Sequence, residues 1–190
     1  MNTGDENNHS SRQGTLHGDL SHDQLVDRFI RVDQAGEYGA VRIYQGQLAV
    51  LGRRPSSSAI REMAAKEEEH LARFNTLVAD RNVRPTVLAP LWNVAGFALG
   101  AATAMLGEKA AMACTAAVEE VITGHYDRQA ERLDDDEADL RHVITEFRAD
   151  EEAHRQTALE HGAEDAPGYL LLTDAIKRGS RLAIWLSERF

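Results

Sequence analysis

Each half of the chain carries one lone glutamate, followed some thirty residues later by a Glu-x-x-His pair. These residues are Glu37 with Glu67 and His70, and Glu119 with Glu151 and His154. Residues three apart on a helix lie about one turn apart on the same side, so each pair can direct both of its side chains at one point. Carboxylate and imidazole groups at open positions suit iron or manganese. The repeated pattern therefore predicts a site for two metal ions.

The predicted ligands lie on the apolar faces of four predicted helices. Residues spaced by three, four or seven positions share one face of a helix. The apolar partners on these faces are Ile30, Val41, Tyr44 and Leu48; Ile60, Met63, Phe74 and Leu77; Met112, Ala116, Ile122, Tyr126 and Leu133; and Leu140, Ile144, Phe147 and Ala158. A buried, unpaired carboxylate costs several kcal/mol or more and needs a cation or a proton. Four carboxylates and two imidazoles facing one core are best explained by metal.

Neighbouring acids help to choose the helical register. Glu68 and Glu69 point away from the apolar face, Glu120 lies on a more mixed face, and Glu152 lies on a charged one. A single Glu-x-x-His is weak evidence, because another occurs in the polar N-terminal stretch at Glu6-x-x-His9. For any one of the six predicted ligands, the alternative is an ordinary surface pair with histidine or arginine.

Composition limits the class of protein. A chain of 190 residues can form one domain with a full core. The formal charge of −10 argues against general nucleic-acid binding. The one cysteine, Cys114, excludes an internal disulfide framework and is expected to be a buried, inert thiol. The chain opens with neither a secretory signal nor an Arg-rich transit peptide, so we expect a cytoplasmic protein.

The pattern of apolar residues and helix breakers predicts an all-α fold. Residues 1–20 are polar and are expected to be disordered, and residues 21–190 are expected to form a single domain. Pro85 and Pro90 interrupt the helical pattern after the second helix. The predicted helices cover residues 22–51, 57–82, 108–133, 137–161 and 169–188, of which the first four form a bundle and the last is additional.

The segment between the second and third of these helices, residues 87–107, has no charged side chain. It lies where a ferritin-like bundle has its long crossover, and we expect an apolar crossover helix here. As a helix it would be roughly 30 Å long, which is also the length of a membrane span. Pro90, Asn93 and its glycines argue against a span, and we expect an element that dips into a bilayer without crossing it.

Residues 169–190 combine apolar side chains with Lys177, Arg178 and Arg181, which suits an anionic membrane surface. The alternative is a fifth helix that packs on the bundle and has ordinary solvated charges.

Four segments resemble the demethoxyubiquinone hydroxylase family of ubiquinone biosynthesis. They are RVDQAGEYGA at 31–40, RPTVL with LWNVAGFALG between 84 and 100, AMACTAAVEE at 111–120, and LAIWLSERF at 182–190. The resemblance extends from about Leu25 to Phe190. It is specific, because the apolar crossover and the closing Leu-Ser-Glu-Arg motif are not general features of ferritins.

The resemblance implies a ferritin-like fold with two Fe ions per chain, bound by the six predicted ligands, of which Glu67 and Glu151 would bridge the irons. It places His125 and Tyr126 near the site. Trp185 stands where many relatives have tyrosine, so a role for a phenol at that position is not expected.

The implied reaction is hydroxylation of the ring of demethoxyubiquinol by O2, at the membrane that holds the prenyl tail. The expected partners are the prenylated quinol, O2 and the lipid surface, with no nucleic acid. The sequence leaves open the electron donor, other ubiquinone-pathway proteins and a homo-oligomer. The expected location is peripheral, on the cytoplasmic face of the cell membrane.

Two alternatives compete with this interpretation. Bacterioferritin-like proteins use the same ligand spacing for iron oxidation and storage, although the long apolar crossover argues against a soluble storage multimer. The other alternative is a non-enzymatic helical protein of the membrane surface, in which the acids and histidines are structural.

Overall fold

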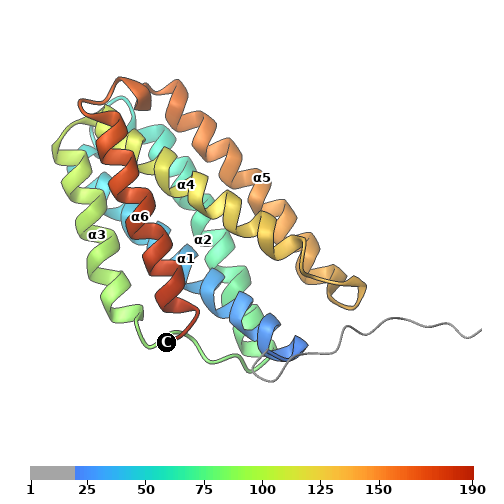
Figure 1. Ribbon diagram of the computed structural model, residues 1–190. Helices are drawn as coiled ribbons and strands as arrows, with labels where there is room; N and C mark the ends of the chain where they lie inside the picture. Colours follow the sequence, from blue (N-terminus) through green and yellow to red (C-terminus); the bar gives the residue numbers. More distant parts are fainter. Residues whose placement is uncertain (1–19) are drawn as a thin grey trace, which may run out of the picture.

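A computed structural model describes residues 20–190, and the predicted disordered tail lies almost wholly outside that range. The described residues form an all-α fold without strands, as predicted (Figure 1). The helices are α1 (His22–Leu51), α2 (Ser57–Asp80), α3 (Ala89–Met105), α4 (Glu108–Ala130), α5 (Ala138–Glu160) and α6 (Tyr169–Ser187), with short 3-10 turns at Asp135–Glu137 and Ala163–Asp165.

The helix boundaries follow local chemistry. Ser21 caps α1 by a reciprocal pair of hydrogen bonds: its Oγ accepts from Gln24 N, and its own backbone N–H donates to Gln24 Oε1. Pro90 lies in the first turn of α3, where its missing N–H costs no helical hydrogen bond. The break predicted at Pro90 is therefore a helix start. The predicted third helix was too long, since Leu133 lies beyond the end of α4.

Helices α1, α2, α4 and α5 form the bundle. Helix α1 runs antiparallel to α4: Asp33 near the start of α1 meets Gln129 near the end of α4, and Gln47 meets Thr115. Figure 1 shows α3 and α6 on the same flank of the bundle, with α5 on the opposite flank. The end of α6 is tied to the start of the crossover because Val87 N donates to Phe190 O.

Helix α3 packs so closely on α1 that the two backbones touch. A Cβ added at Gly100 would lie 1.9 Å from Ile43 O, and one at Gly46 would lie 2.2 Å from Phe97 O. Only glycine permits this approach. The apolar crossover is therefore a helix fixed along the bundle, not a loose connection.

The buried apolar residues form clusters at different levels of the bundle. Tyr44, Ile60 and Met112 belong to one cluster, and Phe74 and Ile144 belong to another. Cys114 is completely buried, and burial raises the pKa of its thiol to about 12, in keeping with the predicted inert thiol.

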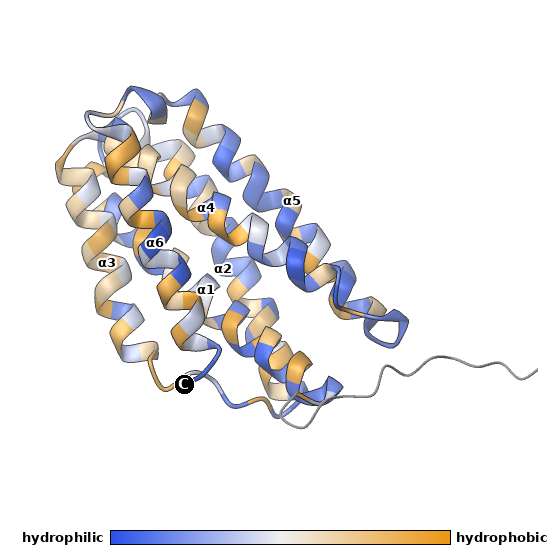
Figure 2. Ribbon diagram, viewed as in Figure 1, coloured by the Kyte–Doolittle hydropathy of each residue, from blue (hydrophilic) through white to orange (hydrophobic). Residues whose placement is uncertain are grey.

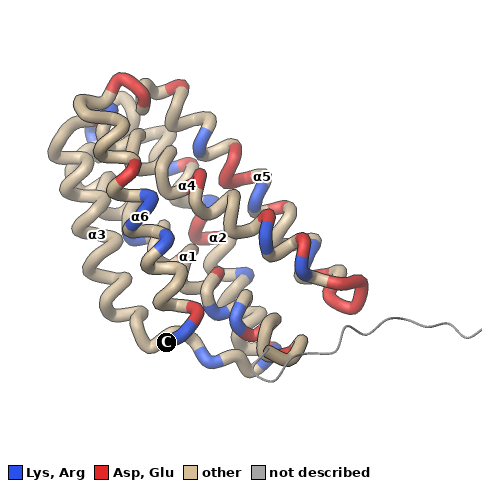
Figure 3. The backbone as a smooth tube through the Cα atoms, in the orientation of Figure 1, with Lys and Arg blue, Asp and Glu red and all other residues tan. Residues whose placement is uncertain are grey.

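The outward side of α3 has large exposed apolar side chains and no charged residue (Figures 2 and 3). Among the described residues, no helix is both long enough and apolar enough to span a membrane. On α6 the predicted basic residues are partly neutralised, since Lys177 pairs with Glu120 at 2.6 Å and Arg178 pairs with Asp174 at 2.9 Å.

Replacing Gly100 by alanine should separate α3 from α1. The added methyl group would overlap a backbone oxygen that cannot rotate away, and overpacking of this kind costs about 1–3 kcal/mol. Gly124→Ala is the control, because its Cβ meets only the end of the Arg128 side chain at 3.6 Å. That change should leave stability unchanged or raise it by up to about 1 kcal/mol. Urea unfolding measures both, and equal midpoints would contradict the close packing.

Candidate metal centre

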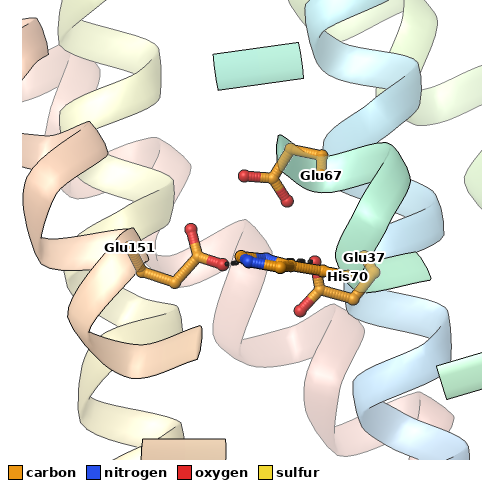
Figure 4. Close-up of side chains that lie close together, drawn as sticks. All are labelled: Glu37, Glu67, His70 and Glu151. Atoms are coloured by element: carbon orange, nitrogen blue, oxygen red, sulfur yellow. Dashed lines mark hydrogen bonds and ion pairs between the residues drawn. The ribbon is translucent and has the colours of Figure 1, made fainter. Parts of the chain in front are cut away.

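The six predicted ligands come together in the middle of the bundle, and each is at most 6% exposed. They form two overlapping groups, in each of which the potential ligand atoms lie within 4.8 Å of one another. One group is Glu37, Glu67, His70 and Glu151, shown in Figure 4, and the other is Glu67, Glu119, Glu151 and His154. Glu67 and Glu151 belong to both groups.

Both histidines turn Nδ1 towards the shared carboxylates. His70 Nδ1 lies 3.1 Å from Glu151 Oε1, and His154 Nδ1 lies 3.2 Å from Glu151 Oε2. His154 Nδ1 is also 2.9 Å from Glu67 Oε1. Glu151 thus lies between the two imidazoles, with one oxygen towards each.

Four carboxylate oxygens at the centre are buried without a hydrogen-bond donor: Glu37 Oε2, both oxygens of Glu67, and Glu119 Oε2. The contact between His154 and Glu67 is close, but it lacks hydrogen-bond geometry. Buried carboxylate oxygens normally have partners, and leaving them without one is costly. Two divalent cations would balance the charge of four carboxylates and occupy these oxygens, so the residues fit a metal pair.

In the metal-free protein, bound protons balance the carboxylate charge in place of metal ions. Burial, and then the charge of Glu151, raise the pKa values of Glu67 and Glu119 well above the ordinary value. Burial alone would lower the pKa of His70, but hydrogen bonds to Glu151 and Glu37 raise it to about 10. The centre therefore favours bound positive charge.

Asp150 contacts the outer ring nitrogen of His70, and the sequence analysis did not identify this role. Its Oδ2 lies 3.1 Å from His70 Nε2 and 3.8 Å from Lys66 Nζ. The ring of Phe147 stacks on His70 with the centroids 3.8 Å apart. A carboxylate on the outer ring nitrogen fixes the orientation of a metal-binding imidazole. The available signal was an acid next to Glu151, but its position off the apolar face made it resemble a surface residue.

The two predicted near-site residues differ in their contacts. Tyr126 OH donates directly to Glu37 Oε1. His125 instead lies 3.4 Å from Asp33 Oδ1, which accepts a hydrogen bond of 2.8 Å from Gln129. Burial raises the pKa of Asp33. This second polar cluster lies about one helical turn from Glu37 on α1, and the sequence analysis did not identify Asp33 or Gln129.

A cavity of about 350 Å³ lies between α1, α3, α4 and α6. Most of the residues that line it are apolar or small. Two of them, Gly36 and Val118, adjoin Glu37 and Glu119 in the sequence. Other residues that line it include Val32, Trp92, Leu99, Ile122 and Ile184. Trp185 is about half exposed and stacks with Arg189, whose guanidinium carbon lies 4.1 Å from the ring centroid.

An all-α bundle with two overlapping carboxylate–histidine groups in its core defines a helical-bundle protein with a candidate two-metal centre. Comparison with known proteins identifies the family. The family model described as "Ubiquinone biosynthesis protein COQ7" matches residues 24–187, and the chain belongs to this family.

Similar proteins occur in bacteria and eukaryotes. The chain is 62% identical over 175 residues to a protein of Rhodospirillum rubrum named 3-demethoxyubiquinol 3-hydroxylase; the match covers 92% of this chain and 82% of the relative. It is 56% identical over 169 residues to a rat protein named NADPH-dependent 3-demethoxyubiquinone 3-hydroxylase, mitochondrial, covering 87% and 78%. It is 42% identical over 182 residues to a yeast protein named 5-demethoxyubiquinone hydroxylase, mitochondrial, covering 87% and 78%.

A bound pair of divalent metal ions should stabilise the protein more at higher pH. In the metal-free fold the raised pKa values of Glu67 and Glu119 favour folding most below 4.5, and this contribution is lost as the pH rises through those values. The contribution of His70 is complete below 6.5 and is lost as the pH rises towards about 10. Because metal ions displace these protons, the difference in melting temperature between metal-loaded and metal-free protein should be larger at about pH 8 than at about pH 6. A difference that shrinks with pH would contradict this.

Proposed function

We propose that this protein hydroxylates the ring of 3-demethoxyubiquinol with O2 at a pair of iron ions, as a step of ubiquinone biosynthesis. Family membership, with 62% identity to a relative named for this reaction, is the observation that carries the proposal. The buried site supports it, because it combines oxygen and nitrogen ligands with carboxylate oxygens that have no donor.

In this proposal Glu67 and Glu151 would be shared between the two irons, since each belongs to both groups. Glu37 and His70 complete one iron site, and Glu119 and His154 complete the other. When bound, a pair of reduced irons would supply the electrons that activate O2, which no side chain of the chain can do. The protein's own part is to hold the ligands in place and to exclude water from them.

The apolar cavity is the proposed site for the quinol ring and the first part of its tail. It lies between the crossover and the bundle, and its wall includes Gly36 and Val118, which adjoin Glu37 and Glu119 in the sequence. An apolar cavity with few polar groups suits a ring that carries an isoprenoid chain. Close packing of α3 on α1 keeps this wall in position.

The overall reaction replaces a ring C–H bond by C–OH. One oxygen atom of O2 enters the ring, and the other leaves as water after taking up two electrons and two protons. The names of several relatives include NADPH dependence, and we propose NADPH as the ultimate source of these electrons here as well.

The exposed apolar residues of α3 and α6 form the proposed membrane-binding face. They include Leu91, Val94, Leu170 and Leu182, each more than half exposed. Such a face suits peripheral insertion into one leaflet, and it would place the cavity near lipid that carries the substrate. The cytoplasmic side of the cell membrane stays a prediction from the sequence.

Hydroxylation should depend on the buried acids and not on their neighbours. Glu67→Gln or Glu151→Gln removes a shared carboxylate and should abolish both paired iron binding and product. Glu68→Gln is the control, because Glu68 is exposed on the same helix. The assay follows a short-tailed demethoxyubiquinol with ¹⁸O2 by mass spectrometry and should find one labelled oxygen in the ring.

Equal damage from Glu68→Gln in a folded protein would contradict the assignment of ligands. Wild-type protein that accumulates a ferric core without product would instead favour iron storage.

Charge on the crossover should release the protein from membranes. Leu91→Glu/Val94→Glu puts two carboxylates on the exposed side of α3, which is unfavourable in an apolar layer. The matched control is Ala72→Glu/Thr76→Glu on α2, which adds the same charge at exposed positions away from α3. Flotation with anionic liposomes should show loss of binding only for the first variant, with iron retained in both. Wild-type protein that does not float would contradict the membrane proposal.

A further inference from the structure

The apolar cavity beside the candidate metal centre has few side chains that can form a hydrogen bond. Among the described residues that line it, Trp92, Ser180 and Ser187 are the ones with a polar side-chain atom, and the others are apolar residues or glycine. In apolar sites, a small number of polar groups fixes the orientation of the ligand. Recognition of oxygen atoms on a ligand therefore depends on these three side chains.

Two of these side chains, Trp92 and Ser187, are bonded to each other across the cavity. Trp92 Nε1 on α3 donates to Ser187 Oγ on α6 at 3.0 Å. In the part of the chain that the structure describes, no Cα atom of α3 lies within 8 Å of a Cα atom of α6. The bond thus joins two helices whose backbones do not touch. Trp92 is the first residue of α3 that lines the cavity and Ser187 is the last of α6, so the bond marks one end of the cavity.

This end of the cavity is level with the metal centre along α1. The register of α1 against α3 follows from two close backbone contacts, Gly39 with Gly96 and Ile43 with Gly100. The two helices are therefore parallel, and the same register puts Trp92 opposite Ala35. Ala35 lines the cavity and comes two residues before Glu37. A group held by the Trp92–Ser187 pair would thus lie at the level where the candidate ligands of α1 begin.

Ser187 keeps a hydrogen-bond donor for a ligand. The residue is 3% exposed, and its Oγ accepts from Trp92. Within the described residues its hydroxyl donates to no protein atom, whereas the hydroxyl of Thr173 on the same helix donates to Tyr169 O. A serine hydroxyl can accept one bond and donate another at the same time, but an indole has a single donor, which this bond uses. Because a buried donor without an acceptor is unfavourable, an oxygen atom of a ligand would complete the pair.

We propose that Ser187, held in place by Trp92, donates a hydrogen bond to one ring oxygen of the quinol and so fixes the ring at this end of the cavity. The inference rests on the proposed function for the identity of the ligand. The two oxygens of a quinol are para to each other, so each remaining ring carbon is next to a carbon that carries oxygen. A bond to one oxygen therefore also positions the neighbouring C–H bond. The tail then extends towards the other end of the cavity, where Leu99 and Gly179 line it.

The test measures the binding of two ligands to the full chain by equilibrium dialysis. One ligand is a demethoxyubiquinone with a short isoprenoid tail, whose ring oxygen accepts the same bond as that of the quinol. The other is the hydrocarbon with the same ring, methyl group and tail but without the ring oxygens. The ratio of the two affinities separates recognition of oxygen from apolar fit.

Ser187→Ala should lower the preference for the quinone by about 3- to 10-fold, the size of one net hydrogen bond, and leave the affinity for the hydrocarbon unchanged. Trp92→Phe should lower the preference by a smaller factor, because Ser187 keeps its hydroxyl. Ser180→Ala is the matched control, because Ser180 lines the same cavity from α6, about two helical turns from Ser187. It should keep the wild-type preference.

An unchanged preference in Ser187→Ala would overturn the inference. Equal losses of affinity for both ligands would also overturn it, because they would show that the bond only holds α3 and α6 in place. A loss of preference in Trp92→Phe or Ser180→Ala as large as that in Ser187→Ala would contradict the choice of Ser187 as the donor. If Ser187→Ala does not fold, Ser187→Cys carries the test with the same expectation, since a thiol is a weak donor.

The proposed function and this inference fail in different ways. Wild-type protein that prefers the quinone but forms no hydroxylated product would refute the proposed function and leave the contact between Ser187 and the ring oxygen in place. Wild-type protein that forms the product but binds both ligands equally well would refute the contact and leave the proposed function intact.

Discussion

The rest of the structure depends on the burial of four carboxylates in one small volume. Glu37, Glu67, Glu119 and Glu151 are each at most 1% exposed, and four of their oxygens have no donor. Such a cluster is unstable unless protons or cations balance its charge. His70, whose pKa is raised to about 10, supplies part of that balance in the metal-free state, and a pair of divalent ions would supply all of it. The apolar clusters along the bundle can then exclude water from the centre.

In the proposed function, the flank formed by α3 and α6 would connect this centre to an apolar substrate. Glycines at the α1–α3 contact bring the crossover against the bundle, and a cavity remains between these helices and α6. The outer side of the same flank exposes apolar residues. If the proposed membrane-binding face is correct, a substrate held in a bilayer would move from lipid to cavity along one face of the molecule. The polar face of α5 lies on the other flank (Figure 2).

The sequence predicted the all-α fold, because apolar residues recur at helical spacing in each of the four bundle helices. Four predicted helices end one to three residues too late, as at Leu133. Pro90 was predicted to interrupt the helical pattern, but it lies in the first turn of α3, because proline is common both between helices and at helix starts. The repeated spacing also predicted that the six candidate ligands lie together, and the structure confirms that they do. Their role as ligands stays a prediction. The sequence did not identify Asp150, Asp33 or the hydrogen bond between Trp92 and Ser187. These contacts join different helices, and their partners depend on helix rotation and direction, which one sequence does not specify.

The most direct test of the account is the metal content of purified wild-type protein, measured per chain and combined with magnetic characterisation. The account predicts about two irons per chain, and it predicts that they are exchange-coupled, because Glu67 and Glu151 are shared between the two groups. A folded protein with a single, fully occupied iron or zinc site would contradict it. In that case the unpartnered oxygens of the second group would need another explanation.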